Sequence, residues 1–410
     1  MLEWISHRFG IEDGQLIING NSLPECDSPY FIYDPNIIID QHNKLSTALP
    51  EFYTFYAMKA NPNPEIVSLL TNLGCGIELA SGGEINLLEQ NGIKAKIVFA
   101  GPGKTAFELN QAKNYGIYSL NVESENEINI ANKLGIPYSI RINPNWKINE
   151  NITMVSGGGA KQFGIDREKL NDLLKNVDKS NAIGLHVFIG SGILNHQEIL
   201  NNYAKIFELA AEMNESFKVK CIDFGGGFGV PYTPNKEPLN MITLKQDIDG
   251  LLKQYSNLAS AKKIIEPGRY LTAKCGVYIT CVVDVKESRG TNFIICEGGI
   301  NHLLRPVLIG VNHPTYIVNK LDQEPIIDYD ICGPICSSVD VIAHNVKLPK
   351  VEKGDLVGMF NSGSYGYTES MPNFLLHPPA KQFMALDDGV FLMDKLSKFI
   401  ANQYLASTKL

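Results

Sequence analysis

Short apolar runs alternate with amphipathic stretches from about residue 31 to residue 270, and this alternation is the strongest constraint on the fold. We expect buried strands at the apolar runs Thr54–Ala57, Gly76–Leu79, Lys96–Phe99, Ser119–Val122, Tyr138–Ile142, Gly184–Phe188, Lys220–Phe224 and Lys263–Ile265. We expect helices at the intervening stretches Pro64–Leu73, Gly82–Gln90, Ala106–Tyr115, Ser124–Leu134, Glu168–Val177, Glu198–Asn214 and Leu244–Tyr255. This order predicts a (β/α)₈ TIM-like barrel, which carries its active site at the C-terminal ends of its strands.

The pattern changes after Tyr270. Strand-like segments at Gly276–Val285, Asn292–Cys296, Glu324–Cys332 and Asp355–Phe360 follow one another without long helices. They predict a C-terminal antiparallel β domain. The chain has 410 residues, which leaves room for it beside a barrel of roughly 250 residues. We expect an N-terminal segment at 1–30, the barrel at 31–270 and the β domain at 271–410.

Composition excludes several function classes. The net charge of −8 argues against nucleic acid as a partner. No apolar run is long enough to span a membrane, and the N-terminus has no signal-peptide pattern. The 8 cysteines include no paired Cys-x-x-Cys zinc motif. We therefore expect a cytoplasmic protein with reduced thiols and no structural metal.

Lys59 stands at the end of an apolar strand, in the segment Phe55-Tyr-Ala-Met-Lys-Ala-Asn-Pro62. The two Asn-Pro pairs that begin at Asn61 break the strand into a turn. A lysine amine at the mouth of a barrel can form a Schiff base with an aldehyde. The alternative is a lysine whose stem packs on apolar surface while its ammonium reaches water.

Three further strand ends carry polar or flexible residues. Cys221-Ile-Asp-Phe-Gly-Gly-Gly-Phe-Gly229 places three glycines after a strand, either as an anion-binding turn or as a plain turn. Ile264-Ile-Glu-Pro-Gly-Arg-Tyr270 combines a carboxylate, a turn and a guanidinium. Gly184-Leu-His-Val-Phe-Ile-Gly-Ser-Gly192 places a histidine on a strand, as a core residue or as a site residue.

With the late segments Cys332-Gly-Pro-Ile-Cys-Ser-Ser-Val-Asp340 and Gly363-Ser-Tyr-Gly-Tyr367, these motifs stand in the order of a known family. Together they resemble the fold-type III decarboxylases that depend on pyridoxal phosphate, the group of diaminopimelate and ornithine decarboxylases. The resemblance covers nearly the whole chain. It implies an alanine racemase-like fold, a pyridoxal 5'-phosphate cofactor and a homodimer with shared active sites. It also implies that residues 1–30 join the C-terminal β domain.

The resemblance assigns the cofactor contacts. Lys59 would form the Schiff base, Glu266 would pair with the pyridine nitrogen and His186 would stack on the ring. Tyr365 would reach the cofactor or the substrate from the second domain. The phosphate would be bound by the residues Ser191, Gly225, Gly226, Gly227, Gly268 and Arg269.

The resemblance also assigns residues to the substrate. Cys336 matches a cysteine that protonates the reacting carbon from the partner subunit, although it could also be a structural thiol. Arg269 and Arg305 match arginines near the substrate, and a guanidinium can bind a carboxylate through two hydrogen bonds. Arg305 could equally form a surface ion pair.

Two positions depart from the family pattern. Ser337 stands where related enzymes carry the acid that binds the distal ammonium of the substrate, and Ile309 stands where a tyrosine is usual. The segments Met154–Gly164, which includes the glycine loop 157–159, and Phe374–Pro379 resemble decarboxylases of biosynthetic clusters. These are the butirosin-type enzyme for carrier-protein-linked glutamate, the exosortase-associated homologues and the siderophore enzymes. We therefore expect a carrier-linked or citryl-linked amino acid as the substrate.

Other readings remain open at this stage. The first alternative is decarboxylation of diaminopimelate or another diamino acid. A second is an amino-acid racemase on a similar barrel, although such racemases place an arginine where Glu266 stands. A third is a protein that binds pyridoxal phosphate without catalysis, although such proteins lack a second domain and a counterpart of Cys336.

Overall fold

The computed structural model describes residues 2–26, 29–146, 154–155 and 159–407. These residues form two compact units. Unit 1 contains Met1–Asp40, Pro231–Glu237 and Leu271–Leu410, and unit 2 contains Gln41–Val230 and Pro238–Tyr270. Residues 31–40, which we expected in the barrel domain, thus group with unit 1. Residues 157 and 158 of the expected glycine loop lie outside the described residues.

Unit 2 is a closed barrel of parallel strands. Each strand pairs with its neighbour, and β8 pairs with β9 to close the circle. The barrel strands are β5 (Phe52–Ala57), β6 (Gly76–Leu79), β7 (Ile97–Phe99), β8 (Ser119–Val122), β9 (Tyr138–Asn143), β12 (Ala182–His186), β14 (Cys221–Asp223) and β15 (Lys262–Ile265). The short strand β11 (Ile165–Asp166) extends the sheet beside β9.

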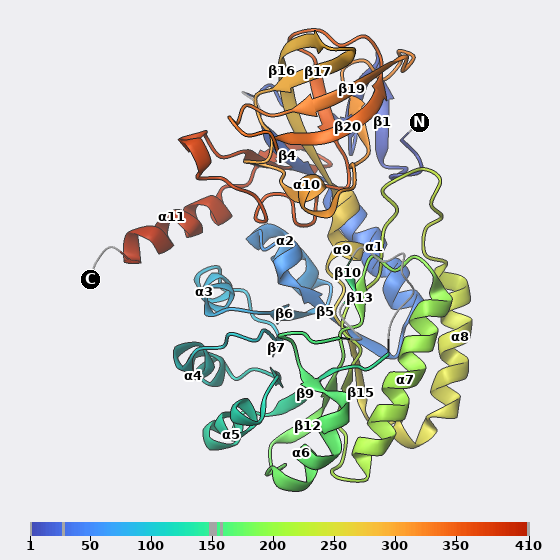
Figure 1. Cartoon of the computed structure of the whole chain (residues 1–410), viewed down its shortest axis with the longest axis vertical. Coiled ribbons are helices and arrows are strands. Elements are labelled where there is room, and N and C mark those ends of the chain that lie inside the picture. Colours follow the sequence, from blue (N-terminus) through green and yellow to red (C-terminus); the bar gives the residue numbers. More distant parts are fainter. Residues whose placement is uncertain (1, 27–28, 147–153, 156–158, 408–410) are drawn as a thin grey trace. The chain divides into compact units, whose positions relative to one another are not determined.

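Helices of unit 2 surround the barrel strands (Figure 1). They are α2 (Pro64–Asn72), α3 (Gly82–Gln90), α4 (Ala106–Tyr115), α5 (Glu125–Leu134), α6 (Leu170–Asn176), α7 (His196–Asn214) and α8 (Met241–Gln254). Several begin at a side chain that accepts a hydrogen bond from the first helical turn, as Ser81, Thr105 and Ser124 do. The strands themselves are almost entirely buried, because helices cover one face and side chains fill the barrel.

Unit 1 is built on a mixed sheet, in the order β20-β19-β17-β16-β4-β22-β23. Its strands are β4 (Tyr30–Tyr33), β16 (Gly276–Ser288), β17 (Thr291–Cys296), β19 (Ile327–Cys332), β20 (Val341–Leu348), β22 (Lys381–Leu386) and β23 (Gly389–Leu392). Two further strands lie off this order: β21 (Leu356–Met359) pairs with β16, and β18 (Thr315–Ile317) pairs with β21. A small sheet of β1 (Phe9–Glu12), β2 (Gln15–Ile18) and β3 (Asn21–Ser22) completes the strands described for this unit.

The pairing within unit 1 corrects one detail of the prediction. The sheet is not purely antiparallel, because β17 runs parallel to β19 and β22 runs parallel to β4. Two helices also belong to this unit, α10 (Arg305–Ile309) and α11 (Lys395–Ser407). The helices α1 (Pro35–Ala48) and α9 (Arg269–Thr272) cross the boundaries between the two units in the sequence.

The fold class predicted from the sequence, a (β/α)₈ barrel with a β domain, is confirmed. Within the described residues, no helix has both the length and the apolar composition that a membrane crossing requires.

Candidate active site

Lys59 lies in a single 3-10 turn, Met58–Ala60, directly after β5. Its ammonium contacts both carboxylate oxygens of Glu78 on β6, at 2.8 and 3.0 Å. The Glu78 side chain is only 2% exposed, whereas that of Lys59 is 52% exposed. The parallel pairing of β5 with β6 brings the two residues together. The lysine is therefore an accessible ammonium held in place by a buried carboxylate.

The glycine triplet packs against neighbouring strand ends. Gly225 and Gly227 have φ angles of +63° and +122°, which residues other than glycine rarely adopt. A Cβ atom on Gly226 would lie 2.5 Å from the carbonyl oxygen of Glu266. The turn therefore needs glycine at each of these positions, both for its backbone angles and for its close approach to the segment that carries Glu266.

Three buried polar side chains meet at the C-terminal ends of neighbouring strands β12, β14 and β15. His186 Nε2 lies 3.3 Å from Glu266 Oε2, and Asp223 belongs to the same cluster, in which the ligand atoms lie within 4.8 Å of one another. His186 Nδ1 has no hydrogen-bond partner among the described residues. Such a set of donors could hold a metal ion or the polar edge of an organic cofactor.

The two carboxyl groups of this cluster differ in charge. Burial, followed by the negative charge of Glu266, raises the pKa of Asp223 well above its ordinary value. Burial also opposes the ionisation of Glu266, but the charge and hydrogen bond of His186, together with the charge of Lys59, outweigh it and lower the pKa of Glu266 to about 2. The two pKa values are therefore pushed apart, so that Glu266 is the carboxyl group that ionises first and Asp223 is the one that holds a proton more strongly.

The Pro267–Gly268 turn links the glutamate segment to the lysine segment. Ala57 donates its backbone N–H to the carbonyl of Pro267 at 3.3 Å. A Cβ atom on Gly268 would lie 2.9 Å from Cβ of Ala60. Arg269 follows, and its Nη2 donates to the hydroxyl of Ser191 at 3.2 Å. The structure thus brings Ser191, Gly268 and Arg269 into the same group of strand ends as Lys59 and Glu266.

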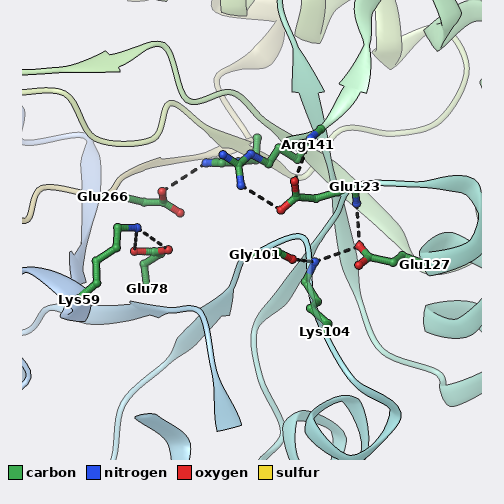
Figure 2. A network of polar contacts seen from close by, with 10 residues as sticks. Lys59, Glu78, Gly101, Lys104, Glu123, Glu127, Arg141 and Glu266 are labelled. Carbon is green, nitrogen blue, oxygen red and sulfur yellow. Dashed lines mark hydrogen bonds and ion pairs between the residues drawn. The ribbon is translucent and has the colours of Figure 1, made fainter. Parts of the chain in front are cut away.

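A second group of charged side chains, which no motif in the sequence indicated, comes from segments on or directly after strands β7, β8 and β9 of the same barrel (Figure 2). Arg141 on β9 donates to Glu123 Oε1 at 2.9 Å, and Glu123 Oε2 accepts the N–H of Gly164 at 2.8 Å. The buried ammonium of Lys104 contacts Glu127 Oε2 at 2.9 Å. These ion pairs bridge consecutive strand ends. The sequence did show a polar residue next to each of these predicted strands. It could not show which of these residues form ion pairs, because that depends on the register of the parallel strands.

Unit 1 carries the predicted substrate residues Arg305, Ile309 and Tyr365. The Arg305 side chain is 2% exposed, and its guanidinium lies 5.0 Å from the centre of the Tyr365 ring. Tyr365 has a φ angle of +58°, a strained value for a residue with a large side chain. Arg305 Nη1 also lies 3.3 Å from a carboxylate oxygen of Glu369. Ile309 ends helix α10 and is half-buried.

Cys336 and Ser337 are exposed residues of the turn between β19 and β20. The turn is organised by the buried side chain of Asp340, whose two oxygens accept the N–H groups of Ile300 and Ile335 at 2.8 Å each. All eight cysteines are free thiols. Asp340 is part of the Cys332–Asp340 motif, but the sequence alone did not show that its side chain fixes the turn.

Comparison with known proteins identifies the group to which this arrangement belongs. Residues 36–273 match the family model described as the pyridoxal binding domain of pyridoxal-dependent decarboxylases. The chain belongs to the pyridoxal-dependent decarboxylase family. A diaminopimelate decarboxylase of Aquifex aeolicus is 32% identical over 405 residues, which cover 94% of each chain. The protein is therefore a decarboxylase that uses pyridoxal phosphate, and neither the racemase nor the non-catalytic alternative is supported.

Two further relatives differ in the substrates that their names give. The L-glutamyl-[BtrI acyl-carrier protein] decarboxylase of Niallia circulans is 32% identical over 374 residues, covering 86% of this chain and 87% of that protein. The crystal structure of diaminopimelate decarboxylase from M. jannaschii with L-lysine has a TM-score of 0.86 and 28% identity, covering 96% of this chain and 98% of that one.

Proposed function

We propose that the chain removes the α-carboxyl group of a diamino acid, and that diaminopimelate is the first substrate to test. The observation that carries this proposal is the set of relatives, most of which are named diaminopimelate decarboxylases. This choice reverses our expectation from Ser337 and Ile309, which had put a carrier-linked or citryl-linked substrate first. The diamino acid was the alternative, and the relatives favour it.

The strand-end residues of the barrel fit pyridoxal phosphate. Glu266 stays ionised and buried beside His186, as a carboxylate that pairs with a protonated pyridine nitrogen must. The glycine turn carries no side chains, and since the N–H of Gly225 donates to Asp223, the N–H groups of Gly226 and Gly227 are the ones that would bind a phosphate. We propose that Lys59 binds the cofactor aldehyde, that His186 stacks on the ring, and that Ser191, Gly225, Gly226, Gly227, Gly268, Arg269 and Tyr365 complete the contacts.

When bound, pyridoxal phosphate withdraws electrons from the carbon that loses CO₂. Glu266 keeps positive charge on the pyridine nitrogen, since its low pKa leaves it ionised at neutral pH. Lys59 can move protons at the reacting carbon once its amine is released, and Glu78 holds that amine in place. Cys336 would then donate a proton to the product carbon from the partner subunit.

A second candidate keeps the tethered or citryl-linked substrate. Ser337 and Ile309 favour it, because they stand where related enzymes carry an acid and a tyrosine. The similarity to the carrier-protein glutamate decarboxylase of N. circulans also favours it. Release of CO₂ should be measured on diaminopimelate, ornithine, lysine and arginine beside glutamyl-carrier and citryl-diaminopropionate substrates. The highest kcat/KM on a diamino acid supports the main proposal, and the highest value on a linked substrate refutes it in favour of the second.

The role of Lys59 has a test that does not depend on the substrate. Purified protein should be yellow, and borohydride should fix the cofactor covalently on the peptide that contains Lys59. Lys59→Ala should abolish this link, whereas Lys347→Ala, at a 57% exposed lysine of unit 1, should leave it intact. A reducible link that survives Lys59→Ala would refute the assignment.

A further inference from the structure

Arg141 is a buried cation of the barrel that our set of predicted site residues did not contain. It lies on β9, where the strand register pairs it with His186 on β12, and His186 is paired in turn with Asp223 on β14. Register partners on neighbouring parallel strands point to the same face of the sheet. The three side chains therefore form one row, and Arg141 extends the buried polar cluster by a permanent positive charge.

The guanidinium of Arg141 is held by a buried carboxylate. Glu123, which follows β8, accepts a hydrogen bond from Arg141 Nη1 at 2.9 Å and a second one from the N–H of Gly164 at 2.8 Å. The guanidinium carbon also lies 4.8 Å from the centre of the Phe163 ring. In the view of Figure 2, the guanidinium lies between the carboxylates of Glu123 and Glu266. These contacts fix its position at the edge of the cluster.

The cluster contains polar atoms that still need a partner. His186 Nδ1, Asp223 Oδ2 and Glu266 Oε1 are buried and have no hydrogen-bond partner within the described part of the chain. Native proteins rarely leave such atoms unpaired, so the row is suited to a polar ligand. Pyridoxal phosphate carries an aldehyde, a pyridine nitrogen, a phosphate and a phenolic oxygen. The proposed contacts assign the aldehyde to Lys59, the nitrogen to Glu266 and the phosphate to the glycine turn, and they leave the phenolic oxygen without a partner.

We propose that Arg141 binds the phenolic oxygen of pyridoxal phosphate, and that Glu123 is the positioning residue that orients the guanidinium. A guanidinium stabilises the anionic form of a phenol, and a hydrogen bond between charged groups is stronger than one between neutral groups. The inference rests on the cofactor contacts of the proposed function and adds one contact to them. It does not depend on which amino acid is the substrate.

The simpler explanation is that Arg141 only neutralises the buried charge of Glu123 and supports the turn at Phe163 and Gly164. In that case the loss of Arg141 would weaken the binding of every ligand of the barrel to the same extent, because the effect would come from the fold. The two explanations therefore differ in whether the effect depends on the phenolic oxygen.

A matched pair of cofactors separates the two explanations. Pyridoxal phosphate carries the phenolic oxygen, and 3-deoxypyridoxal phosphate lacks it. The dissociation constants of both are measured by titrating cofactor-free protein and following the absorbance of the bound cofactor. In Arg141→Met, the affinity for pyridoxal phosphate should fall about 10-fold to 100-fold, and that for the deoxy compound by less than about threefold. Glu123→Gln keeps the guanidinium but orients it less well, and should lower only the affinity for pyridoxal phosphate, by about threefold to tenfold.

The neighbouring ion pair supplies a control of similar burial. The side chains of Lys104 and Glu127 are 1% and 11% exposed, and Lys104→Met with Glu127→Gln removes both charges together. This variant should keep the preference for pyridoxal phosphate over the deoxy compound within about threefold of that of the unaltered protein, whatever the change in its Tm. A loss of preference as large as that in Arg141→Met would overturn the inference, because any buried ion pair of this region would then have the same effect.

The outcomes distinguish this inference from the proposed function. An equal loss of affinity for both cofactors in Arg141→Met, or no loss for either, overturns the role of Arg141. If the unaltered protein forms no reducible link between pyridoxal phosphate and Lys59, the proposed cofactor contacts fail and the inference fails with them. If the link forms and Arg141→Met keeps the preference of the unaltered protein, the inference alone is overturned. Thermal unfolding checks the fold of each variant. Should Arg141→Met not fold, Arg141→Met with Glu123→Gln leaves no unpaired charge and carries the same prediction.

Discussion

Asp223 and Glu266 show how a neighbouring histidine separates the pKa values of two buried carboxyl groups. Because burial and the charge of Glu266 favour the protonated form of Asp223, Asp223→Asn replaces that form with a neutral group of the same shape. The Oδ1 atom of asparagine can still accept the N–H of Gly225, as Asp223 Oδ1 does at 3.0 Å. We expect kcat/KM at neutral pH to stay within about tenfold in this variant. Glu266→Gln removes the ionised partner and should lower kcat/KM about 100-fold or more. Equal losses in the two variants would contradict this assignment of charge.

The same pair predicts a dependence of stability on pH. The pKa of Asp223 is raised in the folded protein, so the folded chain holds a proton that the unfolded chain releases. The stability from this group is fully present below its ordinary pKa and is lost as pH rises through the raised value. In cofactor-free protein, Asp223→Asn should therefore show a smaller fall in the free energy of unfolding as pH rises from acid to neutral. Urea titrations at several pH values measure this, and identical profiles for both proteins would refute it.

At the scale of elements, the turn that carries Cys336 and Ser337 depends on one buried acid. Asp340→Ala would leave the N–H groups of Ile300 and Ile335 without their acceptor, at a cost of about 1–3 kcal/mol for each group. We expect faster amide hydrogen exchange across residues 333–340 and a lower free energy of unfolding. Asp328→Ala, which removes a 48% exposed acid of β19 paired with Lys347, is the control. Unchanged exchange in Asp340→Ala would show that the strands alone hold the turn.

Elements differ in how well the sequence could predict them. The barrel strands at Gly76–Leu79 and Ser119–Val122 coincide with their predictions, because each stands between two amphipathic helical stretches in a regular alternation. The strand pairing in the sheet of unit 1 was harder to predict from the sequence. Its parallel pairs join distant segments, such as Lys381–Leu386 with Tyr30–Tyr33, and no local pattern encodes such pairing.

The residues of the candidate site also differ in how well the sequence could predict them. Residues at strand ends with a distinctive motif, such as Lys59 and Glu266, could be singled out from the sequence. Glu78 and Arg141 look like ordinary polar residues within strands, and only the parallel register reveals their partners. Glu369 follows the Gly363–Tyr367 motif and belongs to no motif that would have marked it as a site residue. Its position beside Arg305 depends on a loop in which Tyr365 adopts a positive φ angle.

At the scale of the whole molecule, the question is whether one chain contains a complete site. The Cys336 thiol is exposed on unit 1. The family resemblance assigns this cysteine to the site of a partner subunit. We therefore predict that Lys59→Ala and Cys336→Ala are each nearly inactive but complement each other after subunit exchange. A heterodimer would combine the intact Lys59 of one chain with the intact Cys336 of the other in one of its two sites. An equal mixture should regain about a quarter of the activity of the unaltered enzyme.

The control for this experiment is a mixture of Lys59→Ala with a chain that carries both substitutions. That mixture contains no intact Lys59, so exchange cannot restore a site. Exchange itself is measured by tagging one chain and recovering the other with it. Recovery above the control requires residues from two chains to act on one substrate, because neither chain alone carries both side chains. If tagged heterodimers form but activity stays at the control level, each chain must use its own Cys336, and the exposed turn would have to reach Lys59 within a single subunit.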